Sequence, residues 1–215
     1  MTEAEARSQL LGVKDRVSER KLRLFACACC RRAWDWFDDE SRSLVLLGER
    51  LADGLATNVE RRAASKKASE RVGSYATGHP ANYAFCGITS PAWHGADLAI
   101  IHLPSMITGI TMRRASGEVR SSKECRIEKE HQQKLLRDIV GHLFVSASVN
   151  SAWLTPAVVS TARSIYRDHA FDRMPILADA LQDAGCTNDD ILNHCRQPGE
   201  HARGCWVVDL ILGKS

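Results

Sequence analysis

Apolar side chains recur at helical spacing over residues 19–37, near the start of the chain. Leu22, Phe25 and Cys29 lie three or four positions apart, which places them on one face of a helix. We expect this face to be a stripe that packs into the core and carries Trp34 near its end. The pattern therefore predicts one amphipathic helix at the start of the fold.

Two further helices are indicated before residue 73. The first carries leucines at helical spacing and ends near Gly54. The second begins at Thr57, because a threonine followed three residues later by Glu60 is the pattern of a capping box. This second helix is polar and rich in arginine and lysine.

Helix signals return in the last third of the chain. Residues 128–141 have helical spacing, and Thr155 followed by Pro156 is a strong helix start. Gly185 ends a later helix. The final segment, residues 205–213, reads CWVVDLILG and fits a helix or a strand equally well.

The central segment, residues 73–126, has no comparable periodicity. Gly, Pro, Asn and Ser recur in it at short intervals, and its apolar runs are brief. We expect an irregular or variable insertion there. The whole pattern predicts a mainly α fold: a single-domain helical bundle over residues 1–215 with an irregular central segment.

Composition narrows the functional classes. The net charge of +3 is too small to indicate nucleic-acid binding by itself. No apolar run approaches the roughly 20 residues that a membrane-spanning helix needs. The charged start of the chain lacks the apolar core of a secretory signal, so we expect a cytoplasmic protein without a membrane segment.

Three sequence blocks carry a family resemblance: KLRLFACACCRR at residues 21–32, AFDRMPILADALQDAGC at 170–186 and GCWVVDLILGK at 204–214. They resemble successive blocks of a planctomycete protein family whose members often follow a short repeat-companion domain. The likeness extends over most of the chain in the same order and fails mainly in the middle. It implies a shared fold and carries no established activity.

Eight cysteines are the unusual feature of the composition. In a cytoplasmic chain of this length we expect reduced thiols, which either fill the core or bind a metal. One hypothesis is a zinc cluster, because zinc takes four nitrogen or sulfur ligands that can come from distant pairs. Its candidate ligands are Cys27, Cys30, Cys195, His201 and Cys205. The alternative is core cysteines with surface histidines and no cofactor.

A cysteine nucleophile is a second hypothesis. Cys29 or Cys30 lies beside arginines, and His194 or His201 would have to be close in space to serve as the base. Common catalytic signatures such as G-x-S-x-G, H-E-x-x-H and the phosphate-binding loop are absent from the sequence. An enzyme is therefore not favoured.

Nucleic-acid binding is a third hypothesis. Basic residues recur along the predicted polar helix, at Arg61, Arg62, Lys66, Lys67 and Arg71. Glutamates interrupt this charge, and a solvated helix face explains it equally well.

The sequence as a whole favours a non-enzymatic protein-interaction or scaffold module that binds a protein partner. The alternatives are a zinc-stabilised helical domain, a cysteine-dependent enzyme and a nucleic-acid-binding protein.

Overall fold

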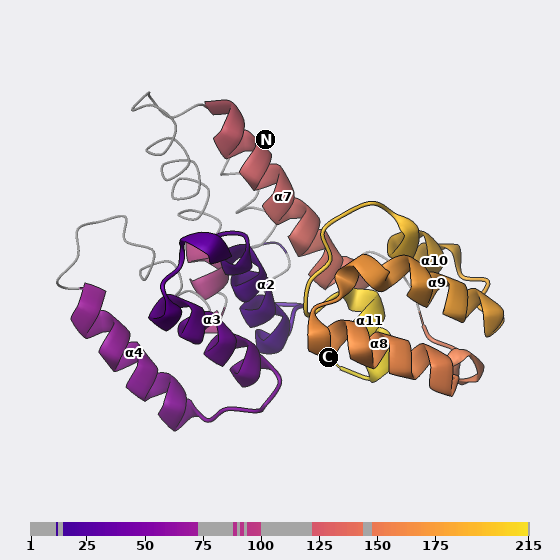
Figure 1. Ribbon diagram of the computed structural model, residues 1–215, viewed down its shortest axis with the longest axis horizontal. Helices are drawn as coiled ribbons and strands as arrows, with labels where there is room; N and C mark the ends of the chain where they lie inside the picture. Colours follow the sequence, from indigo (N-terminus) through magenta and orange to yellow (C-terminus); the bar gives the residue numbers. More distant parts are fainter. Residues whose placement is uncertain are drawn as a thin grey trace. The chain divides into compact units, whose positions relative to one another are not determined.

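The computed structural model describes most of the chain: residue 12 and residues 15–72, 88–89, 91–92, 94–99, 122–143 and 148–214. Regular structure in this part of the chain is helical throughout, without strands (Figure 1), so the predicted mainly α class is confirmed. None of its helices combines the length and the apolar character needed to cross a membrane. Contacts divide the chain into two compact units, Met1–Gln133 and Lys134–Ser215. A single domain over the whole chain stays a prediction.

Unit 1 is built around α2. Its elements are α2 (Glu19–Arg31), the short 3-10 turn η1 (Trp34–Trp36), α3 (Asp39–Ala52), α4 (Asn58–Val72), a helical stretch at residues 94–99 and the first part of α7 (Ser122–Val140). α2 packs against α3, and α3 packs against α4.

Helix α2 is shorter and more deeply buried than the sequence predicts. The predicted stripe residues Leu22, Phe25 and Cys29 are buried, but burial extends beyond the stripe to every residue from Lys21 to Cys30 except Arg23. Most of the helix is enclosed, which small Ala and Cys side chains permit. The helix ends at Arg31, and Trp34 lies half-buried in η1 instead of in the core.

The predicted limits of α3 and α4 are confirmed. α3 ends just before Gly54, which has a positive φ of 71°. The Thr57 hydroxyl accepts a hydrogen bond from the Glu60 backbone N–H at 3.2 Å, and the Glu60 carboxylate accepts one from the Thr57 backbone N–H at 2.7 Å. This reciprocal pair is the capping box that the sequence indicates.

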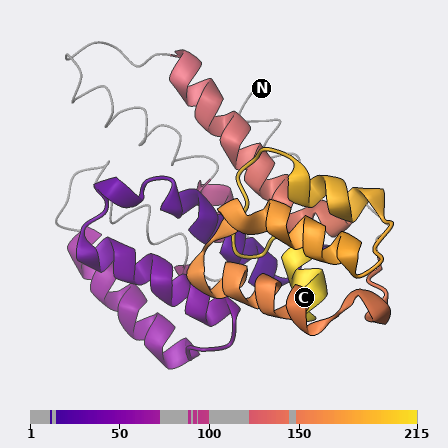
Figure 2. The same ribbon diagram turned by 45° about the vertical axis from the view of Figure 1, so that its right-hand side comes forward.

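Unit 2 is a compact set of helices. Its elements are the end of α7, η3 (Gly141–Leu143), η4 (Ser151–Trp153), α8 (Pro156–Asp168), η5 (Phe171–Arg173), α9 (Met174–Asp183), α10 (Asp189–Arg196) and α11 (Trp206–Leu212). α8 packs against α9 and α11, and α9 packs against α10 (Figures 1 and 2).

The helix signals of the last third are confirmed in unit 2. The Thr155 hydroxyl accepts a hydrogen bond from the Val158 backbone N–H, with Pro156 at the first helical position. Gly185 follows α9 with a φ of 84°. The final segment forms α11, which settles the choice between helix and strand. Its apolar side chains join the buried core of the unit.

Only part of the central segment can be compared with its prediction. Within residues 73–126, residues 94–99 are helical and α7 begins at Ser122, earlier than the sequence suggests. The remaining residues of this segment lie outside the described part, except for residues 88–89 and 91–92.

One close contact in unit 2 requires a glycine. A Cβ atom at Gly141 would lie 2.6 Å from Cδ1 and 2.8 Å from Nε1 of Trp206. Real Cβ atoms do not approach so closely, so the indole ring packs directly on the backbone of Gly141. This contact fixes the ring at the start of α11.

The substitution Gly141→Ala tests this packing. We expect it to lower the free energy of unfolding by about 1–3 kcal/mol, because the added methyl group overpacks a buried site. Denaturant unfolding followed by circular dichroism measures the change. Gly199→Ala is the matched control, since a Cβ there meets no atom within 4 Å. Equal unfolding midpoints for the two variants would contradict the contact.

Candidate metal centre

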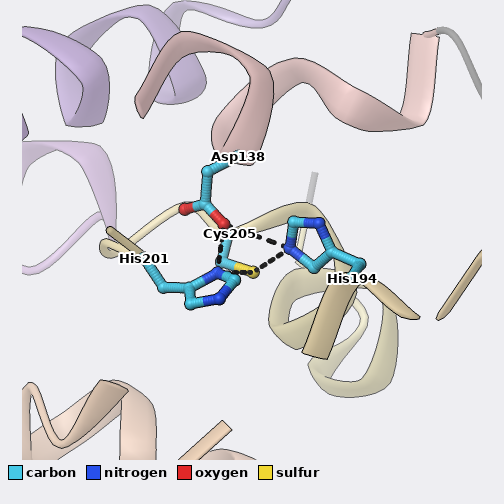
Figure 3. A group of neighbouring side chains, drawn as sticks. All are labelled: Asp138, His194, His201 and Cys205. Atoms are coloured by element: carbon cyan, nitrogen blue, oxygen red, sulfur yellow. Dashed lines mark hydrogen bonds and ion pairs between the residues drawn. The ribbon is translucent and has the colours of Figure 1, made fainter. Parts of the chain in front are cut away.

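Four side chains of unit 2 that can each ligate a metal converge on one buried point (Figure 3). They are Asp138, His194, His201 and Cys205, and their ligand atoms all lie within 4.8 Å of one another. The exposed fraction is 3% for the Asp138 side chain, 4% for His201 and 9% for His194, and Cys205 is fully buried. Water therefore has little access to these donors.

Three separate segments of the unit position these side chains. Asp138 lies in the last turn of α7 and His194 in the last turn of α10, while His201 and Cys205 belong to the loop between α10 and α11. Cys205 directly precedes α11. The cluster therefore ties together residues separated by up to 67 positions along the chain.

Arg203 anchors the loop between α10 and α11. Its guanidinium donates to the backbone oxygens of Tyr166 and Arg167, both at 3.0 Å, and lies over the Tyr166 ring. These oxygens belong to the last turn of α8, where a cation is favourably placed. The loop that carries two of the four donors is therefore held at a helix end.

The Asp138 carboxylate is the hub of the cluster. Its Oδ1 lies 2.6 Å from Nδ1 of His201 and 3.1 Å from Nε2 of His194, and its Oδ2 accepts the Ala202 backbone N–H at 3.0 Å. Burial by itself raises the pKa of this carboxyl, but the hydrogen bonds and charge interactions with His194 and His201 together outweigh burial and hold the pKa below its usual value. Asp138 is therefore an ionised carboxylate inside the protein.

The Cys205 sulfur lies beside both imidazoles. Its Sγ is 3.2 Å from Nε2 of His194 and 4.0 Å from Nδ1 of His201 (Figure 3). Burial is the main cause that raises the pKa of this thiol well above its usual value, and the negative charge of Asp138 is the second. Without a cation to stabilise the thiolate, Cys205 keeps its proton.

This geometry does not favour a cysteine nucleophile. A catalytic relay uses the two nitrogens of one histidine, one for the nucleophile and the other for the orienting acid. In the cluster a single nitrogen, Nε2 of His194, faces both Cys205 and Asp138. The cysteines proposed from the sequence, Cys29 and Cys30, are fully buried in the core of unit 1.

The four donors fit a zinc ion. Zinc binds nitrogen, sulfur and carboxylate oxygen at about 2.0–2.3 Å, which separates neighbouring ligands of a tetrahedral ion by roughly 3.3–3.7 Å. Three of the pairs described above lie at 3.1, 3.2 and 4.0 Å, close to that range. The fourth of these pairs, His201 Nδ1 and Asp138 Oδ1 at 2.6 Å, would have to open by roughly 0.7 Å or more.

The other ring nitrogen of His201 lies outside the candidate metal site, because Nδ1 is the nitrogen that faces Asp138 and Cys205. This atom, Nε2, is buried and makes no hydrogen bond within the described residues. A buried nitrogen left without a partner costs about 1–3 kcal/mol.

Two of the predicted zinc ligands are brought together by the structure, and two members of the cluster were not in the predicted set. His201 and Cys205 form the predicted pair. Asp138 and His194 complete the group. His194 is adjacent to the predicted Cys195, whereas Asp138 lies 56 residues earlier and carried no motif.

The other three predicted ligands lie outside this group. Cys195 belongs to the buried core of unit 2, where burial raises the pKa of its thiol to about 12. Cys27 and Cys30 are buried in the core of unit 1, and the Cys27 thiol donates a weak hydrogen bond to the Val45 backbone oxygen at 3.7 Å. These three thiols act as small apolar side chains of the two cores.

The basic residues of α4 were the basis for the nucleic-acid hypothesis. Lys67 forms an ion pair with Glu40 at 3.0 Å, and Arg61 donates to the side-chain oxygen of Asn58. A second basic stretch of the sequence, with Arg113, Arg114, Arg120, Lys123 and Arg126, lies largely outside the described residues. These contacts add nothing in favour of nucleic-acid binding.

A groove lies between α3 and α4. It has a volume of about 480 Å³ and is lined by Leu44, Leu47 and alanines of α4. Ion pairs between Arg50 and Glu60 and between Glu40 and Lys67 border it. It is the place where a protein-interaction role would be sought.

Comparisons with known proteins add no functional assignment. No family model, no curated protein and no solved structure matches the chain. The resemblance to a planctomycete family stays a prediction.

The substitution Asp138→Asn tests the hub of the cluster. We expect the metal-free protein to lose about 3 kcal/mol of unfolding free energy, because a neutral amide cannot satisfy both imidazoles and the Ala202 N–H. Unfolding in the presence of a chelator measures the change. Asp179→Asn is the control, since the Asp179 side chain is 73% exposed and its loss should change stability by less than about 0.5 kcal/mol. An equally small effect at Asp138 would contradict its role as the hub.

Proposed function

We propose that residues 134–215 form a zinc-stabilised helical module, in which Asp138, His194, His201 and Cys205 hold the ion. The observation that carries this proposal is the convergence of four buried donors, all of types that zinc prefers. The bound ion would link three segments of the chain: the end of α7, the end of α10 and the loop before α11. Its role would be structural, since four protein ligands leave no coordination position for a substrate.

Charge balance supports zinc at this point. A buried carboxylate is stable only where opposite charge or several hydrogen bonds compensate it. Zinc with the Asp138 carboxylate and the Cys205 thiolate forms a site with no net charge, and the two neutral imidazoles complete it. A doubly charged cation would also remove the obstacle to ionising Cys205, whose thiol pKa is raised by burial and by Asp138.

The size of the unit also supports a stabilising metal. A domain near 80 residues gains only a few kcal/mol from its hydrophobic core, and small domains commonly add a metal or disulfides. The thiols of Cys186, Cys195 and Cys205 form no disulfide. A reducing compartment such as the cytoplasm would keep Cys205 available as a ligand.

A protein-interaction role is the second candidate. The groove between α3 and α4 favours it, because an apolar floor bordered by charged pairs suits a peptide or helix of a partner protein. The two roles are compatible, since they involve different residues.

Zinc binding can be measured directly. We expect protein purified without a metal-affinity tag to contain about one zinc per chain by elemental analysis. At free zinc about 100 times its Kd, binding should add about 2.7 kcal/mol to the unfolding free energy, and a strong chelator should remove it. Protein without zinc whose unfolding midpoint is the same with and without added zinc would overturn the proposal.

Cobalt substitution identifies the sulfur ligand. We expect Co²⁺ to produce visible bands of a four-coordinate ion and a near-ultraviolet thiolate-to-cobalt band. The substitution Cys205→Ser should abolish the thiolate band and weaken binding, because a neutral hydroxyl is a poor ligand. Cys195→Ala is the matched control: it removes a thiol from the same unit that lies outside the cluster. Loss of the band in Cys195→Ala, with retention in Cys205→Ser, would show that the sulfur ligand is misassigned.

A further inference from the structure

The two ring nitrogens of His194 have different surroundings. Nε2 faces Asp138 and Cys205 inside the cluster. Nδ1 faces away from it and lies 3.0 Å from the indole Nε1 of Trp206 and 3.3 Å from the carboxamide Nε2 of Gln197. The hydrogen bonds made by Nδ1 decide which ring nitrogen carries the proton, and so whether Nε2 has a lone pair free to bind a metal.

The Trp206 contact assigns the proton of the neutral imidazole. An indole N–H is only a donor, so Nδ1 of His194 must accept from it with a lone pair. The ring proton then lies on Nε2, where it is donated to the Asp138 carboxylate. As arranged, the nitrogen that faces the cluster carries a proton.

A metal ion at Nε2 reverses this assignment. The ion takes the Nε2 lone pair, so the proton of the neutral ring must lie on Nδ1. Nδ1–H and the Trp206 indole N–H are then two donors that face each other. The ring needs an acceptor at Nδ1, and Trp206 cannot be one.

Gln197 can supply that acceptor. A carboxamide has an oxygen and a nitrogen of similar size, and a half-turn exchanges them. The turn would place the Gln197 oxygen where its nitrogen now lies, 3.3 Å from Nδ1. Gln197 is exposed and its backbone N–H is bonded to the Asn193 oxygen, so the amide can turn without disturbing the end of α10.

Trp206 cannot easily move away from the ring. Its indole packs on the backbone of Gly141, where even a Cβ atom would approach Nε1 to 2.8 Å. The indole N–H thus stays directed at His194 and favours the tautomer that does not bind metal.

We infer that Gln197 and Trp206 set the metal affinity of the site in opposite directions, by selecting the tautomer of His194. Gln197 is a positioning residue that accepts the Nδ1–H of the metal-bound ring. Trp206 opposes binding by donating to the same nitrogen. This inference rests on the proposed zinc site.

Zinc affinity of the full chain, measured by competition with a chromophoric chelator, tests the inference. We expect Gln197→Leu to weaken zinc binding about tenfold, in the range typical of lost outer-sphere hydrogen bonds to a ligating histidine. Gln197→Glu should restore wild-type or tighter binding, because a carboxylate is an acceptor in every orientation. Gln182→Leu is the control, since Gln182 is an exposed glutamine of α9 that contacts Arg196.

The substitution Trp206→Phe should change the zinc affinity in the opposite direction. It keeps an aromatic ring but removes the donor, so we expect zinc to bind about tenfold more tightly while the metal-free protein becomes less stable. A variant that merely loosened the fold would lose affinity and stability together. Long-range ¹H–¹⁵N spectra of His194 should show the proton on Nε2 without metal and on Nδ1 with zinc.

The outcomes separate the two proposals. Absence of zinc binding by the wild-type chain overturns the zinc site itself, and this inference with it. Zinc binding by the wild type that is unchanged in Gln197→Leu, or weakened in Trp206→Phe, overturns only the tautomer selection. Opposite changes in the two variants, with the proton on Nδ1 in the zinc form, support it.

Discussion

The buried carboxylate of Asp138 is the constraint on which the organisation of unit 2 depends. A charge with a 3% exposed side chain requires compensation, and here two imidazoles and a backbone N–H provide it. These donors come from the end of α10 and from the loop before α11. The hydrogen bonds of this carboxylate therefore connect the end of α7 with α10 and with the loop before α11.

The same convergence makes the cluster a candidate for binding a cation. The imidazole nitrogens of His194 and His201 form hydrogen bonds to one oxygen of Asp138. The same nitrogens would be the metal ligands if zinc took the place of the protons between them and the carboxylate. Burial leaves water little access to the donors, and it keeps the Cys205 thiol protonated in the absence of a cation. In the proposed zinc site, these buried donors would enclose the ion, as in a structural site.

Local signals in the sequence predicted the fold well where a single residue governs a helix end. Thr57, Thr155 and Gly185 act through their own backbone surroundings, and the structure confirms each of them. The extent of burial around α2 could not be predicted in this way. Small side chains such as Cys29 are compatible with an exposed or an enclosed position, and only the surrounding helices decide which one they occupy.

Two of the four residues of the candidate site could be predicted from the sequence, because their signal is also local. His201 and Cys205 are close in the chain, so spacing alone suggested them, whereas their partners come from other helices. Asp138 nevertheless left a signal. It lies three residues after Leu135 and directly before Ile139, on the buried face of α7, where an aspartate is costly unless donors surround it. A charged residue within an apolar stripe therefore predicts that polar partners exist, although it does not name them. Here the partners include the imidazole of His194, whose tautomer depends in turn on Gln197 and Trp206.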